Sequence, residues 1–153
     1  MAVLNLNLEA VVPSDVFGWE VNTDVGYGRE TFTISTRGKI GVGEVLEVNY
    51  ADKTAVRLGV LAAVTDVDAL GDLAIFVGRD LPNNPATAQD FDRLTLDATG
   101  EGVAITRGDG RGTLYKKYLK LGDVAFYDLP AAVQAALVAK FTTENRFKVL
   151  DQV

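Results

Sequence analysis

The sequence predicts a mainly β domain with one α-helix near the C-terminus and an extended N-terminal arm. Residues 39–80 contain three short apolar runs separated by turn-forming Gly, Asp and Asn residues. Residues 130–141 are the segment in which apolar residues recur with clear helical spacing. Strands and helices do not alternate along the chain, as they would in a doubly wound nucleotide-binding fold. A small β-meander with a helix near its end is therefore the expected architecture.

The meander is the most apolar and most patterned part of the chain. Its first run is Val45, Leu46 and Val48, its second covers residues 56–61, and its third covers residues 73–77. Each run has roughly four to eight residues, which suits a strand and is too short for a helix. We expect three strands joined by short turns, forming the core of the domain.

The N-terminal region has a different character. Three leucines alternate with polar residues over residues 4–9, which is the pattern of a strand with one apolar face. Pro13 ends this strand, because proline cannot donate a hydrogen bond to a sheet. The region is either an edge strand and loop packed on its own domain, or an arm that adds a strand to a partner's sheet. The residues expected to make the arm's contacts are Leu4, Leu6, Leu8, Val11, Val12, Phe17 and Trp19.

On this basis the chain divides into residues 1–30, an arm and loop, and residues 31–153, a β-rich domain. Residues 30–36 alternate apolar and hydroxyl side chains, as in a strand with one wet face. Two prolines and a polar composition predict a surface excursion over residues 80–102. A short strand is expected at residues 103–106.

The last third of the chain is predicted to hold the helix. Residues 114–121 mix aromatic and basic side chains and fit either a strand or a short helical turn. Pro130 suits the first turn of a helix over residues 130–141, where its missing N–H has no partner to lose. Phe147 and Val149 predict a short closing strand.

Composition excludes several classes of chemistry. The chain contains no cysteine and no histidine, which removes disulfides, the usual zinc sites and the commonest general base. Fifteen basic and 21 acidic residues give a net charge of −6, so general binding to nucleic acid is not expected. No apolar run approaches the roughly 20 residues needed to cross a bilayer, and the N-terminus lacks the pattern of a signal peptide. We expect synthesis in the cytoplasm and no membrane partner.

Three motifs in the sequence resemble known kinds of site. Residues 66–72 carry alternating carboxylates and a glycine, but lack the later acidic ligand of a helix–loop–helix calcium site. Arg107-Gly108-Asp109 matches an adhesion tripeptide that occurs by chance in glycine-rich turns. Lys116-Lys117 lies between two tyrosines and fits a solvated rim or partner contact better than a nucleic-acid patch. No catalytic, metal or cofactor site follows from these motifs, and we expect a protein that is not an enzyme.

The order of several weak motifs resembles the lambda-type head decoration (capsid cement) proteins of tailed phages. The similar segments are residues 43–46, 59–62, 66–68 and 73–77 in the meander, then residues 119–123, 131–137 and 146–149. Together these segments and their connections span about two-thirds of the chain. The N-terminal region has no counterpart in the family, and the excursion over residues 80–102 is long for it.

The resemblance implies a small open-barrel, β-tulip-like domain without cofactor or catalysis. It also implies a homotrimer on the outer surface of the virion head, at threefold and quasi-threefold positions, with the major capsid protein as partner. Two alternatives remain open. One is another virion β-domain, of the tail tube or baseplate. The other is a carboxylate-dependent hydrolase, for which the sequence offers no distinct acidic pair.

Overall fold

The computed structural model describes residues 11, 13–19, 28–35, 38–59, 61–79, 95–96 and 99–151. Within these residues the strands outnumber the helices, and the main helix comes near the C-terminus, as the sequence predicts. The elements are α2 (Pro13–Val16), β1 (Phe17–Trp19), β2 (Arg29–Ser35), β3 (Ile40–Gly41), β4 (Val45–Asn49), β5 (Thr54–Arg57), α3 (Val64–Asp68), β6 (Asp72–Arg79), β7 (Thr95–Leu96), β8 (Gly100–Ile105), β9 (Thr113–Tyr115), the 3-10 helix η2 (Lys116–Tyr118), β10 (Lys120–Leu121), β11 (Val124–Ala125), the 3-10 helix η3 (Phe126–Asp128), α4 (Ala131–Thr143) and β12 (Lys148–Leu150).

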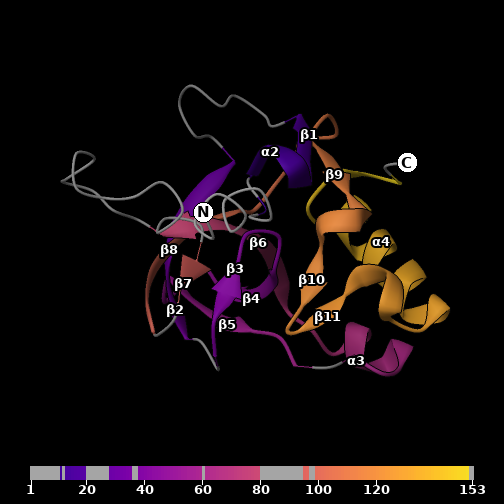
Figure 1. The fold of residues 1–153 in the computed structure, drawn as a ribbon, viewed down its shortest axis with the longest axis horizontal. Coiled ribbons are helices and arrows are strands. Elements are labelled where there is room, and N and C mark those ends of the chain that lie inside the picture. Colours follow the sequence, from indigo (N-terminus) through magenta and orange to yellow (C-terminus); the bar gives the residue numbers. More distant parts are fainter. Residues whose placement is uncertain are drawn as a thin grey trace, which may run out of the picture.

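Five strands close into a barrel in the order β2-β5-β4-β6-β8 (Figure 1). Residues 39–80 supply β4, β5 and β6, but β4 lies between the other two, so the expected meander order is wrong; β2 and β8 complete the ring. β2 lies antiparallel to β8 over Arg29 to Ile34, and parallel to β5 over Thr33 to Ser35. Because β2 pairs with β5 along one edge and with β8 along the other, the ring has no gap. The expectation of an open barrel is therefore wrong.

Two apolar clusters form on the two faces of the barrel wall. The barrel core fills the inside of the ring and consists of Phe32, Ile34, Ile40, Leu46, Val48, Ala55, Ala74, Phe76, Leu96 and Ala104. The outer core lies between the wall and the C-terminal elements, and includes Val16, Phe17, Val45, Leu61, Val67, Leu73, Ile75, Val77, Ile105, Leu114, Leu119, Leu121, Phe126, Val133, Leu137, Phe141 and Phe147. Alternate residues of β6 belong to the two cores, which is why six consecutive residues of this strand are buried.

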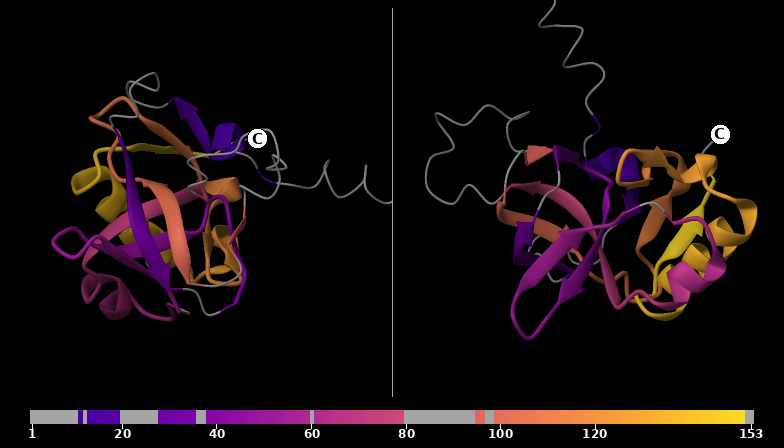
Figure 2. Two further views of the ribbon diagram at one scale, coloured as in Figure 1. Left: turned by 90° about the vertical axis from the view of Figure 1, so that its left-hand side faces the viewer. Right: turned by 90° about the horizontal axis from the view of Figure 1, so that it is seen from below.

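Helix α4 covers the outer core. Val133, Leu137 and Phe141 are spaced four residues apart, so they lie on one face of the helix, and all three are fully buried. The helix begins directly after Pro130 and ends at Thr143, close to the predicted range. In Figure 1 and in the right-hand view of Figure 2, α4 and the strands β9 to β12 form a second layer beside the barrel.

The N-terminal elements also belong to this second layer. β1 pairs antiparallel with β9, and β12 pairs parallel with β9 on its other edge, giving the sheet β1-β9-β12. Val16 and Phe17 are buried in the outer core. The division at residue 30 therefore placed the boundary of the arm too late, because residues 13–19 are part of the folded domain.

Other differences lie in short elements. Residues 66–68 belong to helix α3 instead of a turn, because the Asp66 carboxylate accepts hydrogen bonds from the N–H groups of Ala62 and Ala63, both at 3.0 Å. The expected excursion over 80–102 contains β7 and the start of β8. The ambiguous residues 114–121 divide into strand, 3-10 helix and strand. No helix in the described part of the chain is long and apolar enough to span a bilayer.

Candidate functional site

The structure does not bring the predicted arm residues together as one exposed set. Leu4, Leu6, Leu8 and Val12 lie outside the described residues. Val11 is partly buried against the outer core. Phe17 is only 7% exposed, and its ring lies 6.1 Å from that of Phe147. Phe17 is thus a core residue and is not available to anchor a partner, which corrects the expectation for this position.

The backbone of Trp19 lies in β1, opposite Thr113 of β9. The side chain of Trp19 is outside the described part of the structure. The predicted role of Trp19 in partner binding therefore stays a prediction, as do the roles of Leu4, Leu6, Leu8 and Val12.

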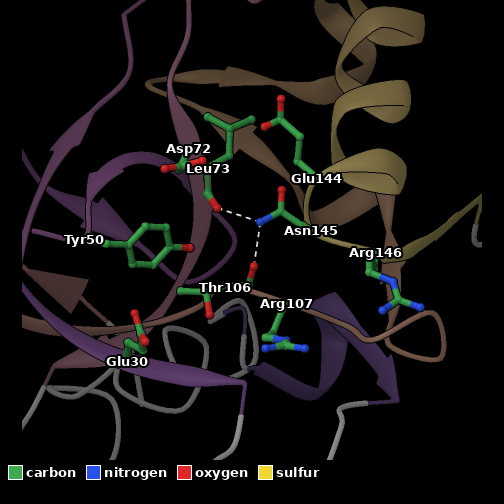
Figure 3. A pocket seen from close by; sticks show the side chains of 9 residues that line it. All are labelled: Glu30, Tyr50, Asp72, Leu73, Thr106, Arg107, Glu144, Asn145 and Arg146. Atoms are coloured by element: carbon green, nitrogen blue, oxygen red, sulfur yellow. Dashed lines mark hydrogen bonds between the residues drawn. The ribbon is translucent and has the colours of Figure 1, made fainter.

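The structure adds a pocket that the sequence did not indicate. It has a volume of about 350 Å³ and lies where the end of α4 meets the barrel (Figure 3). Nine residues from five parts of the chain line it: Glu30, Tyr50, Asp72, Leu73, Thr106, Arg107, Glu144, Asn145 and Arg146. Residues so far apart in the sequence meet here because β2, β8 and β6 are neighbours in the barrel. The chain after α4 returns to the ends of these strands.

Asn145 forms the wall of this pocket on the side of α4. Its side chain is buried, and its Nδ2 donates to the carbonyl oxygens of Leu73 at 2.7 Å and Thr106 at 2.6 Å. Both hydrogen bonds use the donor end of the amide, so Oδ1 points away from the two carbonyls, toward the side on which Glu144 lies (Figure 3). Oδ1 is buried and has no hydrogen-bond partner. Asn145 therefore has a structural donor end and an unused acceptor end.

Tyr50 forms the opposite wall, and its hydroxyl points into the pocket (Figure 3). Burial raises the pKa of Tyr50, and the carboxylates of Glu30 and Asp72 raise it further. A hydrogen bond with Thr106 and the charge of Arg107 oppose this increase only in part. Glu30 and Asp72 each act on this pKa more strongly than Arg107 does, so these three charges together favour the protonated hydroxyl.

The two arginines of the lining lie toward the rim. Arg107 Nε donates to Asp109 Oδ1 at 2.8 Å, so much of its charge is already matched outside the pocket. The guanidinium of Arg146 points away from Tyr50 and Asp72 (Figure 3). Two of the three lining carboxylates have ion-pair partners, with Glu144 2.9 Å from Lys140 Nζ and Glu30 3.5 Å from Lys53 Nζ. Among the described residues, Asp72 is thus the lining carboxylate for which no ion pair is found.

The charged residues of the three motifs described above pair with groups of the same chain. Arg107 and Asp109 pair with each other, and Asp66 caps α3. Lys116 Nζ lies 3.5 Å from a carboxylate oxygen of Asp151. Within the described ranges, no group of three or more acidic residues could hold a metal ion.

The pocket exposes the Asp72 carboxylate and the Tyr50 hydroxyl, whereas Asn145 Oδ1 is buried out of reach of solvent. No local spacing in the sequence reports this site. The one signal was Asn145, four residues after the end of the predicted helix, and it resembles an ordinary helix stop. Comparison of the chain with protein-family models, with curated proteins and with solved structures gives no match.

Proposed function

We propose that the protein is a capsid decoration (cement) protein of a tailed phage. In this proposal it forms a homotrimer on the outside of the mature head and clamps neighbouring major capsid subunits against the pressure of packaged DNA. The barrel with its C-terminal helix would be this protein's form of the β-tulip-like domain of that family.

One observation supports this proposal most strongly. Each of the seven segments that carry the resemblance contributes at least one residue to the same cluster, the outer core or the partly buried side chains packed against it. These residues are Val45, Leu61, Val67, Leu73, Ile75, Val77, Leu119, Leu121, Val133, Ala136, Leu137, Phe147 and Val149. Motifs that are weak one by one thus meet in a single packed unit, as expected if they were retained together for one fold.

The clamp would use the segment before Pro13. Residues 2–10 would add a strand to capsid backbone, with Leu4, Leu6 and Leu8 filling pockets. The root of this segment is fixed, because Val16 and Phe17 are buried in the outer core. A fixed root transmits load from the arm to the domain, which a clamp requires.

Avidity would supply the affinity. Ordering about ten residues costs on the order of 10–20 kcal/mol of backbone entropy, so one arm binds weakly. Once one arm of a trimer is bound, the other two are held at high effective concentration, which strengthens binding by ~10²-fold or more.

The test removes the arm without touching the folded domain. A variant lacking residues 2–10 should keep its trimeric mass and its circular dichroism spectrum, and should bind expanded, undecorated phage heads at least ~100-fold more weakly than the full chain. The cut is placed there because truncation to residue 31 would also remove Val16 and Phe17 from the core. Trimeric mass is measured by light scattering, and binding by cosedimentation with heads.

A matched pair of variants checks the face of the arm. Replacing Leu4, Leu6 and Leu8 by Ser should weaken head binding nearly as much as the deletion. Replacing Asn5 and Asn7 by Ser should leave binding within about twofold, because these side chains face away from the capsid pockets. A monomeric mass, or equal decoration by the armless variant, would contradict the proposal.

A further inference from the structure

The charges of this chain are divided between its two layers. Residues 107–148, which include β9 to β11, α4 and the start of β12, contain eight of the 15 basic residues and only four of the 21 acidic residues. Residues 1–106 contain sixteen acidic and seven basic residues. The second layer is therefore positive, whereas the part of the chain that includes the barrel is negative. Each copy thus carries charge of both signs in separate regions.

The positive charge is concentrated around the loop between β8 and β9. Four exposed basic residues, which together form the basic loop, lie there: Arg107, Arg111, Arg146 and Lys148. The N–H of Gly110 donates to the carbonyl oxygen of Arg146 at 2.7 Å, and the N–H of Lys148 donates to that of Gly112 at 2.7 Å. These bonds hold the loop against the chain after α4. One of the four cations pairs with a carboxylate, but no ion pair is found for the other three within the described ranges.

A groove of the opposite charge lies on the barrel. It has a volume of about 570 Å³ and is lined mainly by residues of β4, β5 and the turn between them. Its lining includes two exposed apolar side chains, with Val56 44% and Tyr50 38% exposed. Glu47 and Asp72 also line it, and neither has an ion pair in the part of the chain that the structure describes. Such a surface suits an arginine, whose methylene stem packs on apolar groups while its head meets a carboxylate.

The basic loop and the groove are neighbours on one copy, but they do not neutralise each other. Both border the pocket beside Asn145. Arg107 and Arg146 of the basic loop line that pocket, and Tyr50 and Asp72 of the groove line it as well. The guanidinium of Arg146 nevertheless points away from Asp72 (Figure 3). Charge complementarity is therefore left for a contact between copies.

We propose that the basic loop of one copy docks in the β4–β5 groove of a second copy, where Arg111 and Arg146 meet Glu47 and Asp72. This contact rests on the homotrimer of the proposed function and identifies the surfaces that join its copies. Because the two surfaces are neighbours, both partner copies lie toward the same side of the molecule, which favours a small closed ring over an open filament. In a ring of three, the directions from one copy to its two partners differ by about 60°.

Mass in solution tests this contact. Light scattering over a concentration series compares the full chain with Arg111→Glu, which reverses a charge of the basic loop, and with Val56→Arg, which places bulk and positive charge in the groove. Each variant should raise the concentration needed for assembly at least about tenfold. Both positions are exposed, so the circular dichroism spectra should stay native.

Two matched controls make the same chemical changes elsewhere. Lys39→Glu reverses an exposed charge before β3, and Val64→Arg replaces a valine of α3 that is 39% exposed. Neither position belongs to the basic loop or to the groove lining. Both controls should assemble within about twofold of the wild type.

A mixture shows whether two different surfaces meet. Arg111→Glu retains the groove, and Val56→Arg retains the basic loop. An equimolar mixture should therefore form a complex with one intact contact, at a concentration at which either variant alone is monomeric. Failure of the mixture to associate would contradict docking of loop in groove.

The outcomes separate this contact from the proposed function. A wild-type trimer that both variants leave intact would overturn the contact and leave the trimer standing. A wild-type dimer that both variants dissociate would support the contact and contradict the trimer, and a monomeric wild type would contradict both. If Arg111→Glu keeps its trimeric mass but loses binding to phage heads, the basic loop contacts the capsid and the proposed contact is wrong.

Discussion

Glu44 shows how one buried charge is held in this protein. Its side chain is 2% exposed, Oε1 accepts from Arg57 Nε at 2.9 Å, and Oε2 accepts from the N–H of Gly41 at 3.0 Å. Arg57 also pairs with Asp123 at 2.8 Å, so the group joins the barrel to the turn between β10 and β11. Burial is the strongest influence and raises the pKa of Glu44, against the opposing effects of Arg57 and Gly41.

This shift predicts a specific pH dependence of stability. Because the native carboxyl group holds its proton more tightly than the unfolded chain does, its contribution is fully present below pH 4.5 and is lost as pH rises through the folded pKa. Each unit of increase in pKa corresponds to about 1.4 kcal/mol. Glu44→Gln removes this titration, so the free energy of unfolding of the wild type should fall relative to this variant as pH rises above 4.5.

Urea denaturation at a series of pH values measures this difference. Glu101→Gln serves as control, because Glu101 is an exposed residue of β8 and its replacement should leave a nearly constant offset. A constant offset for Glu44→Gln as well would show that burial does not govern the proton affinity of Glu44.

Residue-scale features were the least predictable from the sequence. Glu44 lies within residues 43–46, and nothing local in the sequence distinguishes it from a surface carboxylate. Its burial results from Arg57, thirteen residues later, and from Asp123, which pairs with the same guanidinium. Phe17 was expected to contact a partner, but it packs on Phe147, from the other end of the chain. Such roles depend on contacts between distant residues.

At the scale of elements, β8 shows the tight limit on side-chain volume inside the barrel. A Cβ atom added at Gly102 would lie 2.5 Å from Ile34 Cδ1 and 2.8 Å from Phe76 Cε1. Neither contact can be tolerated without movement of a fully buried side chain in the barrel core. Glycine is needed here for close packing.

Gly102→Ala is therefore expected to destabilise the protein by about 1–3 kcal/mol through overpacking. Gly59→Ala is the matched control, since no atom lies within 4 Å of the added Cβ, and it should be neutral or slightly stabilising. Thermal or urea unfolding of the two variants gives the comparison. Equal stability of both would mean that the barrel interior can expand around a methyl group.

The elements that the sequence predicted well have a regular pattern over a buried surface. α4 has apolar residues at four-residue spacing, β2 alternates, and β6 is an unbroken apolar run because both of its faces are buried. Elements of two to five residues, such as β3, β7 and α3, are too short to show a period. β3 and β7 form because each pairs with the other, whereas α3 is held by local hydrogen bonds around Asp66.

At the scale of the molecule, the barrel and the layer containing α4 are joined by Asn145. Its side-chain amide connects the end of α4 to Leu73 of β6 and to Thr106, directly after β8. This contact couples the two layers, together with the apolar outer core and the Arg57–Asp123 ion pair. The sequence predicted strands and a helix without indicating how they are joined, because the junction consists of contacts between residues far apart in the chain, of which the Asn145 amide is one.

Asn145→Ala should lower the free energy of unfolding by about 2–4 kcal/mol, since two buried carbonyl oxygens lose their donor. Thr143→Ala, at the exposed end of the same helix, should change it by less than about 0.5 kcal/mol. Urea unfolding followed by circular dichroism measures both. Indistinguishable midpoints would show that water replaces the amide without loss, and that the apolar surface alone joins the layers.

The sheet β1-β9-β12 has a consequence for how the protein can be displayed. Phe17 pairs with Leu114 and Leu150 pairs with Tyr115, so β1 starts and β12 finishes at the same end of β9. With two strand spacings between them, these points are roughly 10 Å apart. The chain therefore enters this sheet at Phe17 and leaves it at Leu150 at the same end, so a surface that meets this end of the sheet would meet both points.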